Sequence, residues 1–538
     1  MHFKNQFAGL LAAAASLALV ATASAQVSAD AILDKLVQKG VLTKDEATEL
    51  EKESENTNAM KQAGTQFKIS KVIKSVELFG DLRMRYENRS AKIGPEGGQY
   101  AGSYDVANRF RYAVRLGLRG DLADDYYYGL RFETSPNERS PWNTFGNASG
   151  GQSPYYGPFS KANNYGVFIG QAYLGWRPLP WLDVEVGRVP QPLYTTSMAW
   201  DSDYTPEGAV EKVHFTRGPI EFFGNLAQYI YQDTTPASAE AVEGGTPAYS
   251  LGDFSDHNAY LMAWQVGGVY HLDTNISFKV APVFYNYVGH GNQSAGFYGP
   301  FVGQGINGFT FNTNSSTGSS TLPGGTGASS VPPGYALPGA NFGSYNQTGI
   351  NNLAILEIPM ELNFKMYNLD FKLFGDYSLN LEGDDRARAA YNAGEAIWSS
   401  PQNTSTTPTP NPFPGGVQLG QDQAMQFGVA VGNNLGLVYG QMVKRGTWEA
   451  RFYWQHVEQY ALDPNLIDSD FFEGRGNMQG FYSALAYSLT DGMIATVRYG
   501  WAERINDQLG TGGFNADLPL PNPVNKYQVL QMDLTWKF

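Results

Sequence analysis

Arginine recurs at alternate positions in two stretches near the start of the chain, and a third stretch adds one more. The seven side chains are Arg83, Arg85, Arg109, Arg111, Arg115, Arg119 and Arg131. Side chains along an extended strand point alternately to opposite faces, so this spacing places the guanidinium groups of each stretch on one face. Guanidinium groups attract anions and also pair with carboxylates. The chemistry that they suggest is therefore electrostatic selection of ions or solutes.

Motifs for catalysis or metal binding are weak in this chain. Residues 303–308 match G-x-G-x-x-G, but no helix follows them in their Gly- and Ser-rich surroundings, so we interpret the match as chance. The six histidines are scattered, without an H-E-x-x-H motif or a pair four residues apart, and no G-x-S-x-G occurs. We therefore expect neither an enzyme nor a bound cofactor or metal ion.

The composition excludes other classes of protein. The chain has 538 residues, no cysteine and a formal net charge of −14. A domain that binds nucleic acid would be basic, so this class is excluded. An exported protein of this length without disulfide bonds must be held together by a large fold of its own.

The pattern that organises the chain is clearest at its end, in residues 526–538. Large apolar residues such as Leu534 and Trp536 occupy every second position, with polar residues between them. The alternation recurs in stretches of about 9–13 residues, the length at which a tilted strand crosses a bilayer. The predicted strands are 76–86, 109–120, 126–134, 165–177, 181–189, 208–216, 220–232, 259–272, 275–287, 351–366, 369–379, 423–432, 447–459, 478–489, 493–504 and 526–538.

Short turns and long loops alternate between these strands. Bacterial outer-membrane barrels have an even number of strands, short periplasmic turns and long external loops, whereas a soluble β-protein has no reason to sort its connections in this way. The sequence therefore predicts an all-β fold, a transmembrane antiparallel β-barrel of about 16 strands over residues 71–538. We expect Leu534, Trp536 and Phe538 to form the recognition signal for the barrel-assembly machinery.

The first 70 residues lack this alternation. Residues 1–25 combine an early lysine, an apolar run and an A-x-A sequence, which predicts a signal peptide cleaved between Ala25 and Gln26. The apolar run is too short to be a membrane helix. Residues 26–70 contain two capped helical patterns, which predict a short helical periplasmic extension. This extension is either a solvated tether or a segment that packs on itself, trimerises or contacts the cell wall.

Two interpretations of the arginines inside such a barrel remain open. In the first, they form a basic ladder along one wall, and the field between this ladder and acids on other strands selects anions or orients dipolar solutes. In the second, they pair with inward acids such as Asp183, Glu357 and Asp533 and only keep the lumen hydrated. Clustering on three consecutive strands favours the first, and the number of inward acids favours the second.

A turn-rich and acid-rich segment follows the fifth predicted strand. It contains Arg188, Trp200, Asp201, Asp203 and Glu207. We expect it to fold into the lumen and form the constriction, the alternative being another external loop. Residues 468–471 form a similar acidic block. Either block could bind calcium, although acid-rich loops usually stay solvated.

The export signal, the helical pattern at 33–50, the acidic blocks around Asp201 and Asp470 and the terminal strand together resemble the bacterial "putative porin" family. That family is similar to the phosphate-selective porin O/P group. The resemblance covers nearly the whole mature chain and implies a trimeric diffusion channel in the outer membrane, with the block near Asp201 beside the constriction. It does not imply phosphate selectivity, because this chain is acidic overall and poor in inward lysine.

The predicted function is an outer-membrane porin, a passive diffusion channel for small hydrophilic solutes or ions. Its expected partners are outer-membrane lipid, the barrel-assembly machinery and two further copies of the chain. The main alternative is a non-conducting barrel that serves as a scaffold for a periplasmic partner protein. A barrel enzyme would need a Ser/His or acid pair at a rim, and a soluble β-sandwich would need its apolar faces to pack as a core.

Overall fold

The structure is a computed structural model. It describes residues 70–94, 102–135, 140–145, 166–232, 259–289, 352–388, 416–441, 443–463, 466–509, 511 and 524–538. The predicted signal peptide, its cleavage site and nearly all of the predicted extension 26–70 lie outside the described residues. The chain divides into two compact units, Met1–Leu78 and Phe79–Phe538, and the second holds most of the described residues.

Antiparallel β-strands make up most of the described residues. Their bounds are β1 Glu77–Ile93, β2 Tyr104–Asp121, β3 Tyr126–Ser135, β4 Asn143–Thr144, β5 Gly166–Leu179, β6 Leu182–Arg188, β7 Glu207–Arg217, β8 Ile220–Gln232, β9 Ala259–His271, β10 Ile276–Val280, β11 Val283–Gly289, β12 Ala354–Glu357, β13 Met360–Met366, β14 Leu369–Asn380, β15 Gln423–Gly432, β16 Trp448–Val457, β17 Met478–Ser488, β18 Met493–Arg504 and β19 Val524–Lys537. A short 3-10 helix, η8, covers Leu437–Tyr439. Within the described ranges, no helix has the length and apolar character needed to cross a membrane.

Two of the strands are interrupted at adjacent points of the sheet. Pro282 separates β10 from β11, and Pro359 separates β12 from β13, because proline has no N–H to donate to the ladder. The backbone bridges the gap where Ala281 N donates to Pro359 O at 3.1 Å. The segment β4 is only a two-residue pairing with β2. With each interrupted strand counted once and β4 left out, the segments form a 16-stranded antiparallel barrel, which confirms the predicted fold class and strand number.

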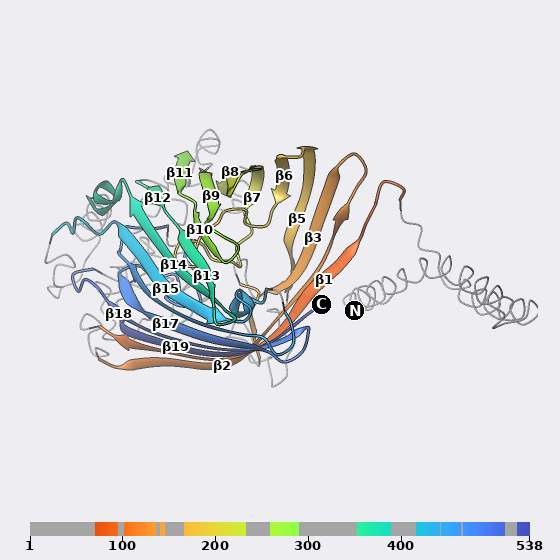
Figure 1. The fold of residues 1–538 in the computed structure, drawn as a ribbon. Coiled ribbons are helices and arrows are strands. Elements are labelled where there is room, and N and C mark those ends of the chain that lie inside the picture. The colour runs from red at the N-terminus through yellow and green to blue at the C-terminus, as the bar shows by residue number, and fades with distance from the viewer. Residues whose placement is uncertain are drawn as a thin grey trace, which may run out of the picture. The chain divides into compact units, whose positions relative to one another are not determined.

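The two ends of the barrel sheet, β1 and β19, pair with each other and close the wall (Figure 1). Their antiparallel register runs from Asp81↔Lys537 to Ile93↔Val524. Gly80 and Phe538 continue it by exchanging two backbone hydrogen bonds of 3.0 and 3.1 Å. A Cβ at residue 80 would lie 2.4 Å from the backbone oxygen of Arg115 and 2.8 Å from the Phe538 ring, so this close approach of backbone and ring requires glycine.

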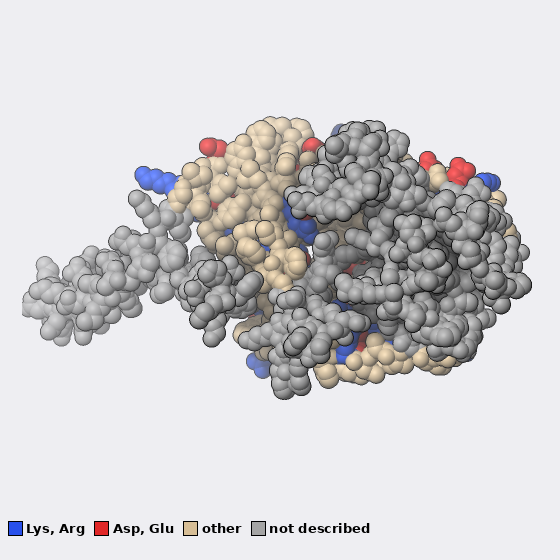
Figure 2. All heavy atoms as spheres, turned by 180° about the vertical axis from the view of Figure 1, so that it is seen from behind, with Lys and Arg blue, Asp and Glu red and all other residues tan. Residues whose placement is uncertain are grey.

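The strands have one apolar outer face and one inner face that carries most of the charges. On β19, outward Leu534 is 43% exposed, whereas its inward neighbour Asp533 is 7% exposed. The part of the outer face visible in Figure 2 is largely uncharged, and blue and red side chains gather at its rims. Near the short turns, Tyr126 stacks on Trp176 with ring centroids 5.8 Å apart, as in the aromatic girdles of outer-membrane barrels.

The predicted short turns are present. Asp124 and Asp125 between β2 and β3, and Tyr367 and Asn368 between β13 and β14, all have positive φ angles of 51–63°. This left-handed conformation matches the twist of tight hairpins. The short turns and the paired chain end near Phe538 therefore lie at one end of the barrel, which we call the short-turn end.

Candidate functional site

Several of the described connections fold into the barrel interior, among them the segment around η8, whose Val438 N donates to inward Glu449 at 2.9 Å. Two others meet each other in the interior. The first inserted segment, residues 189–206, joins β6 to β7, and the second inserted segment, residues 458–463 and 466–477, lies between β16 and β17. Met198 and Trp200 of the first and Ile467 and Phe472 of the second are each at most 4% exposed. Because both segments also bond to inward side chains of the strands, this burial places them against the inner face of the wall.

Three consecutive residues anchor the first segment to inward acids of β12, β13 and β14. The Tyr194 hydroxyl donates to Glu361 Oε2 at 2.7 Å, the Thr195 hydroxyl to Glu357, and the Thr196 hydroxyl to Asp376. We call the inward acids Glu357, Glu361 and Asp376 the carboxylate wall. Glu357 and Asp376 are at most 1% exposed. These two acids therefore serve as acceptors that hold the segment in place.

A buried glutamine fixes the backbone of the same segment. Gln265 on β9 accepts from Tyr194 N at 2.9 Å and donates to Tyr194 O at 2.7 Å. Trp200 packs between Tyr229 and Tyr285, with ring centroids 6.1 and 6.4 Å away. The predicted constriction segment is thus tied down by backbone, hydroxyl and aromatic contacts.

The seven predicted arginines lie on the inner face of β1, β2 and β3, on the opposite side of these contacts. The structure adds Arg89 to this group, because β1 continues past the predicted end of the strand at residue 86. We call these eight side chains the arginine wall: Arg83, Arg85, Arg89, Arg109, Arg111, Arg115, Arg119 and Arg131.

The arginine wall is also rich in ion pairs. Glu87 lies within 4 Å of four arginines, including Arg109 at 2.6 Å and Arg89 at 3.1 Å. Glu133 contacts Arg131 at 3.1 Å, and Asp533 of β19 contacts Arg85 at 2.8 Å. The clustering expected from one interpretation and the pairing expected from the other are therefore both present.

Acids from both inserted segments reach the arginine wall. Asp203 of the first segment pairs with Arg115. Asp470 of the second contacts Arg85 at 2.7 Å, and Glu473 contacts Arg89 at 3.2 Å. The first segment therefore bridges the carboxylate wall, through hydroxyls, and the arginine wall, through a carboxylate.

The two inserted segments also bond to each other. Asp201 N donates to Leu466 O at 2.6 Å, and Asp468 N donates to Ser197 O at 3.3 Å. Ser469 donates to Asp201 Oδ2 through its backbone N–H at 3.2 Å and its hydroxyl at 3.1 Å. We call this set of contacts the clasp.

Each segment contributes an Asp-Ser-Asp tripeptide in which the two acids have different surroundings. Burial and the charge of Asp203 raise the pKa of Asp201 to about 7. Burial and the charge of Asp201 raise the pKa of Asp468 well above its ordinary range. Burial would raise the other two as well, but Arg115 holds the pKa of Asp203 below its ordinary value, and Arg85 does the same for Asp470.

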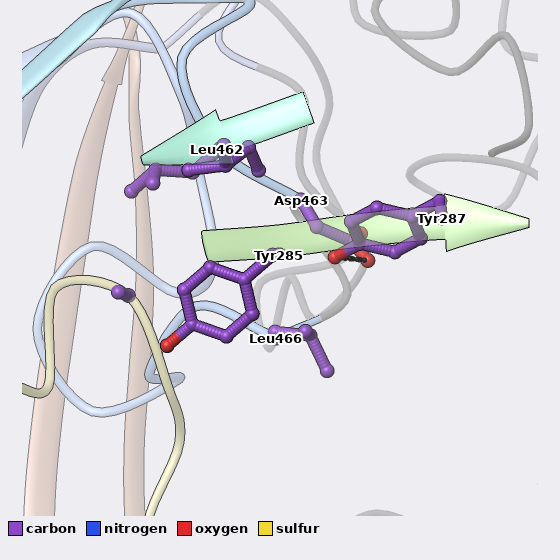
Figure 3. Close-up of a pocket in the computed structure, with 7 residues that line it drawn as sticks. Tyr285, Tyr287, Leu462, Asp463 and Leu466 are labelled. Atoms are coloured by element: carbon purple, nitrogen blue, oxygen red, sulfur yellow. Dashed lines mark hydrogen bonds between the residues drawn. The ribbon is translucent and has the colours of Figure 1, made fainter. Parts of the chain in front are cut away.

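A small pocket lies between the two segments and the wall (Figure 3). Its lining is Ala199, Tyr285, Tyr287, Ile355, Leu462, Asp463 and Leu466. The Tyr287 hydroxyl points at Asp463 and donates to it at 2.9 Å. The described part of the chain contains no group of three or more His, Cys, Asp or Glu side chains arranged to hold a metal ion. The suggested calcium sites therefore find no support there.

The other predicted site residues lie apart from these contacts. Arg188 and Glu207 stand at the base of the first segment, where strands β6 and β7 end, and pair with each other at 2.7 Å. Leu534 and Trp536 face outward on β19, and Phe538 lies at the seam. Their role as an insertion signal stays a prediction.

Sequence reasoning missed the second inserted segment. The acidic block 468–470 is partly exposed, but the adjoining Phe471 and Phe472 are at most 2% exposed, so the segment is held inside the barrel instead of forming an external loop. The available signal was the repetition of Asp-Ser-Asp at 201–203 and 468–470. The hydroxyl anchors at 194–196 and Gln265 carried no signal, because their partners lie far away in the sequence.

Solved structures with a similar arrangement of chain were found, all at low identity. The anion-selective porin of Comamonas acidovorans is 9% identical, with 86% of this chain and 99% of that chain covered and a TM-score of 0.38. OprB of Pseudomonas putida is also 9% identical, with 86% and 94% covered and a TM-score of 0.42. The outer-membrane channel DcaP of Acinetobacter baumannii is 10% identical, with 88% and 100% covered and a TM-score of 0.35. No curated protein sequence matches significantly.

A family model with the description "Putative porin" matches residues 99–538, well over half of the chain. The family and the closed antiparallel barrel with its apolar outer face indicate a channel and not an enzyme. The chain therefore belongs to the "Putative porin" family and is an outer-membrane diffusion channel.

Proposed function

We propose that this channel passes small hydrophilic solutes and ions by passive diffusion along the arginine wall, with the two inserted segments forming the constriction. The observation that carries the proposal is the difference in exposure between the two sides of the lumen. The side chains of Arg83, Arg109 and Asp470 are 24%, 18% and 33% exposed, although Arg85, Arg89, Arg111 and Arg115 are at most 7% exposed. On the carboxylate wall, the side chain of Glu361 is 13% exposed, and Glu357 and Asp376 are at most 1% exposed. The most exposed of these charges lie on the arginine side, so water can reach the arginine wall around Arg83 and Arg109.

The arginine wall acts as the electrostatic filter in this proposal. On β1–β3 the inward arginines outnumber the inward acids Asp81, Glu87 and Glu133. A wall of one sign at a narrow point raises the local concentration of oppositely charged solutes. We therefore expect a preference for anions, which Asp203 and Asp470 reduce. Phosphate selectivity, as in the O/P group, is not part of this proposal.

The experiment is single-channel recording of the purified protein in a planar bilayer across a salt gradient. Stepwise conductance is expected, with a reversal potential of the sign that anion preference produces. A reversal potential of the opposite sign would still be consistent with a diffusion channel, but it would contradict the proposed role of the arginine wall.

A second candidate is a non-conducting barrel that serves as a scaffold for a periplasmic partner. The observation in its favour is that the first inserted segment is bonded to both walls and to the second segment. A folded and inserted barrel that carries no current would favour this candidate over the channel.

The channel is proposed to be a homotrimer assembled by the barrel-assembly machinery, with the terminal strand as its signal. One outer surface supports a contact between subunits. Glu211 on β7 pairs in register with outward Val184 and Leu226 and accepts from Gln228 at 2.9 Å. A carboxylate near the middle of a lipid-facing strand is unfavourable unless it is covered. Replacing Glu211 by lysine should reduce the trimer band on mildly denaturing gels, and an unchanged band would place the contact elsewhere.

A further inference from the structure

One connection at the short-turn end is much longer than its neighbours. The other described hairpins at this end have two to four residues between their strands, whereas β15 ends at Gly432 and β16 begins at Trp448. We call the described part of this connection, residues 433–441 and 443–447, the η8 segment. Gly436 and Gly440 flank η8 with φ angles of 97° and 71°, which lets the chain turn sharply on both sides of this short helix.

Inward side chains from three strands hold the η8 segment inside the barrel. Glu449 of β16 is 0% exposed and accepts from Val438 N at 2.9 Å. Arg498 of β18 donates to Val438 O at 3.0 Å. Lys537 of β19 donates to Gly440 O. The segment therefore extends across the ends of β16–β19 as far as the seam between β19 and β1.

Apolar side chains join the η8 segment to the second inserted segment. Leu437 and Val438 are 0% and 3% exposed and belong to one buried cluster with Phe471 of the second inserted segment. In the same cluster, Tyr453 of β16 stacks on Tyr482 of β17 with ring centroids 4.7 Å apart. Tyr453 also meets Phe471 edge-on at 6.0 Å. The lumen beside β16 and β17 is therefore packed with side chains.

The arginine wall begins next to the η8 segment. Lys537, which bonds to Gly440, pairs in register with Asp81 of β1. Asp81 in turn pairs with Arg83 at 2.6 Å, and the side chain of Arg83 is 24% exposed. A solute that follows the arginine wall to the short-turn end therefore passes the η8 segment.

Tyr439 of η8 lies in the lumen at this point. Its ring is 4.7 Å from the guanidinium of Arg451, which also lies 5.0 Å from the ring of Phe374. Because Arg451 and Phe374 are inward residues of β16 and β14, this contact places the ring of Tyr439 inside the barrel. Tyr439 is nevertheless 52% exposed. The exposed part of its side chain therefore faces the open space near the short-turn end.

We propose that the η8 segment forms a second constriction, at the short-turn end, and that Tyr439 limits the size of the solutes that pass it. The inference rests on the proposed function, because it concerns the same pathway. The inserted segments and the η8 segment restrict the current one after the other, as resistances in series. Tyr439 thus determines specificity by size, whereas the arginine wall determines it by charge.

The test is single-channel conductance in symmetrical salt. Tyr439→Ala removes an exposed ring and keeps the backbone contacts of η8, so conductance should rise, whereas the bulkier Tyr439→Trp should lower it. Tyr367→Ala is the matched control, since Tyr367 lies in the turn between β13 and β14 at the same end and is 89% exposed. This control should conduct as wild type.

A cysteine at the same position gives a second measurement if Tyr439→Ala fails to assemble. The chain has no cysteine of its own, so a bulky thiol reagent would attach only to Tyr439→Cys. The attached group should lower the current through this variant. A current that stays the same after complete labelling contradicts the second constriction.

A double variant tests whether the two constrictions lie on one path. Gln265→Ala removes the contact of β9 that holds the first inserted segment. When one of two resistances in series is widened, the other still limits the current. The gain in conductance of Gln265→Ala with Tyr439→Ala should therefore exceed the sum of the gains of the two single variants. A gain equal to that sum would overturn the series arrangement.

The outcomes separate this inference from the proposed function. Wild-type conductance in both Tyr439→Ala and Tyr439→Trp, or an equal rise in Tyr367→Ala, overturns the second constriction but leaves the channel. A wild-type barrel that inserts and carries no current overturns both proposals.

Discussion

The carboxylate wall and the arginine wall both consist of inward charges on neighbouring strands, yet their surroundings differ. Glu357 and Asp376 accept bonds from neutral hydroxyls and are sealed from water. Arg83 and Arg109 are partly exposed and pair with acids. The alternation of side chains along a strand therefore shows which charged residues point into the lumen. It does not show which of them line the path of the solutes. The distinction is made by the inserted segment, which covers one wall and leaves the other partly open.

The chemical type of the bonding partners explains why the two walls differ in exposure. Neutral hydroxyls and the Gln265 amide can approach buried groups closely without bringing a second charge out of water. Ion pairs tolerate partial hydration, and at partly exposed positions each contributes little to stability. The covered wall is thus suited to anchoring, and the open wall to electrostatic selection.

The largest effect is expected from breaking the anchor on the covered side. Gln265→Ala would leave the partly buried N–H and C=O of Tyr194 without these partners, and the cost for each group is at most about 1–3 kcal/mol, the value for a fully buried group. The first inserted segment should detach, and single-channel conductance should rise and become noisier. Gln528→Ala, an exposed position on β19, is the control and should behave as wild type. An unchanged conductance in Gln265→Ala would show that this anchor does not hold the constriction.

A smaller effect is expected from neutralising the open wall. Removing one charge about 10 Å from a permeating ion in water changes its energy by about 0.4 kcal/mol, roughly twofold in permeability. Arg83→Gln combined with Arg131→Gln should therefore shift the reversal potential toward cations. Arg177→Gln, an exposed rim position paired with Asp121, should leave it unchanged. Equal shifts of the reversal potential in the double variant and in Arg177→Gln would mean that the arginine wall affects ion selectivity no more than a charge at the rim does.

The smallest effect is expected from neutralising the covered wall. Glu357→Gln removes a charge from a group that accepts from Thr195 and Tyr285 and is 0% exposed. The reversal potential of the Glu357→Gln variant should match that of wild type. Its net charge changes by one unit, against two units in the double arginine variant. A shift of similar size would show that solutes do reach the carboxylate wall.

The barrel could be predicted from the sequence because its strands alternate with a period of two in consecutive stretches. The prolines at 282 and 359 interrupt two predicted strands, but they do so at matched positions, so the pairing of the neighbours continues. The ends of β1 and β2 were less predictable. Both strands continue beyond the predicted bounds toward the end of the barrel opposite the short-turn end. Arg89 lies in this extension of β1, which is why it was missed.

The constriction could be predicted only in part. The acidic composition and turn residues near Asp201 pointed to an inserted loop, but its contacts depend on which strands lie opposite each other across the lumen. Arg85, for example, meets Asp533, 448 positions away in the sequence. Pairings of this kind have no local pattern, and neither does the burial of Phe471 and Phe472.

The most direct test of the account is the accessibility of single cysteines to a charged, thiol-reactive methanethiosulfonate during single-channel recording. The chain has no cysteine of its own, so each introduced thiol is the sole target. We predict that reagent added to the bath changes the current of Arg83→Cys and leaves that of Ser378→Cys unchanged, because Ser378 on β14 is 0% exposed. A response at residue 378 without one at residue 83 would contradict a pathway along the arginine wall.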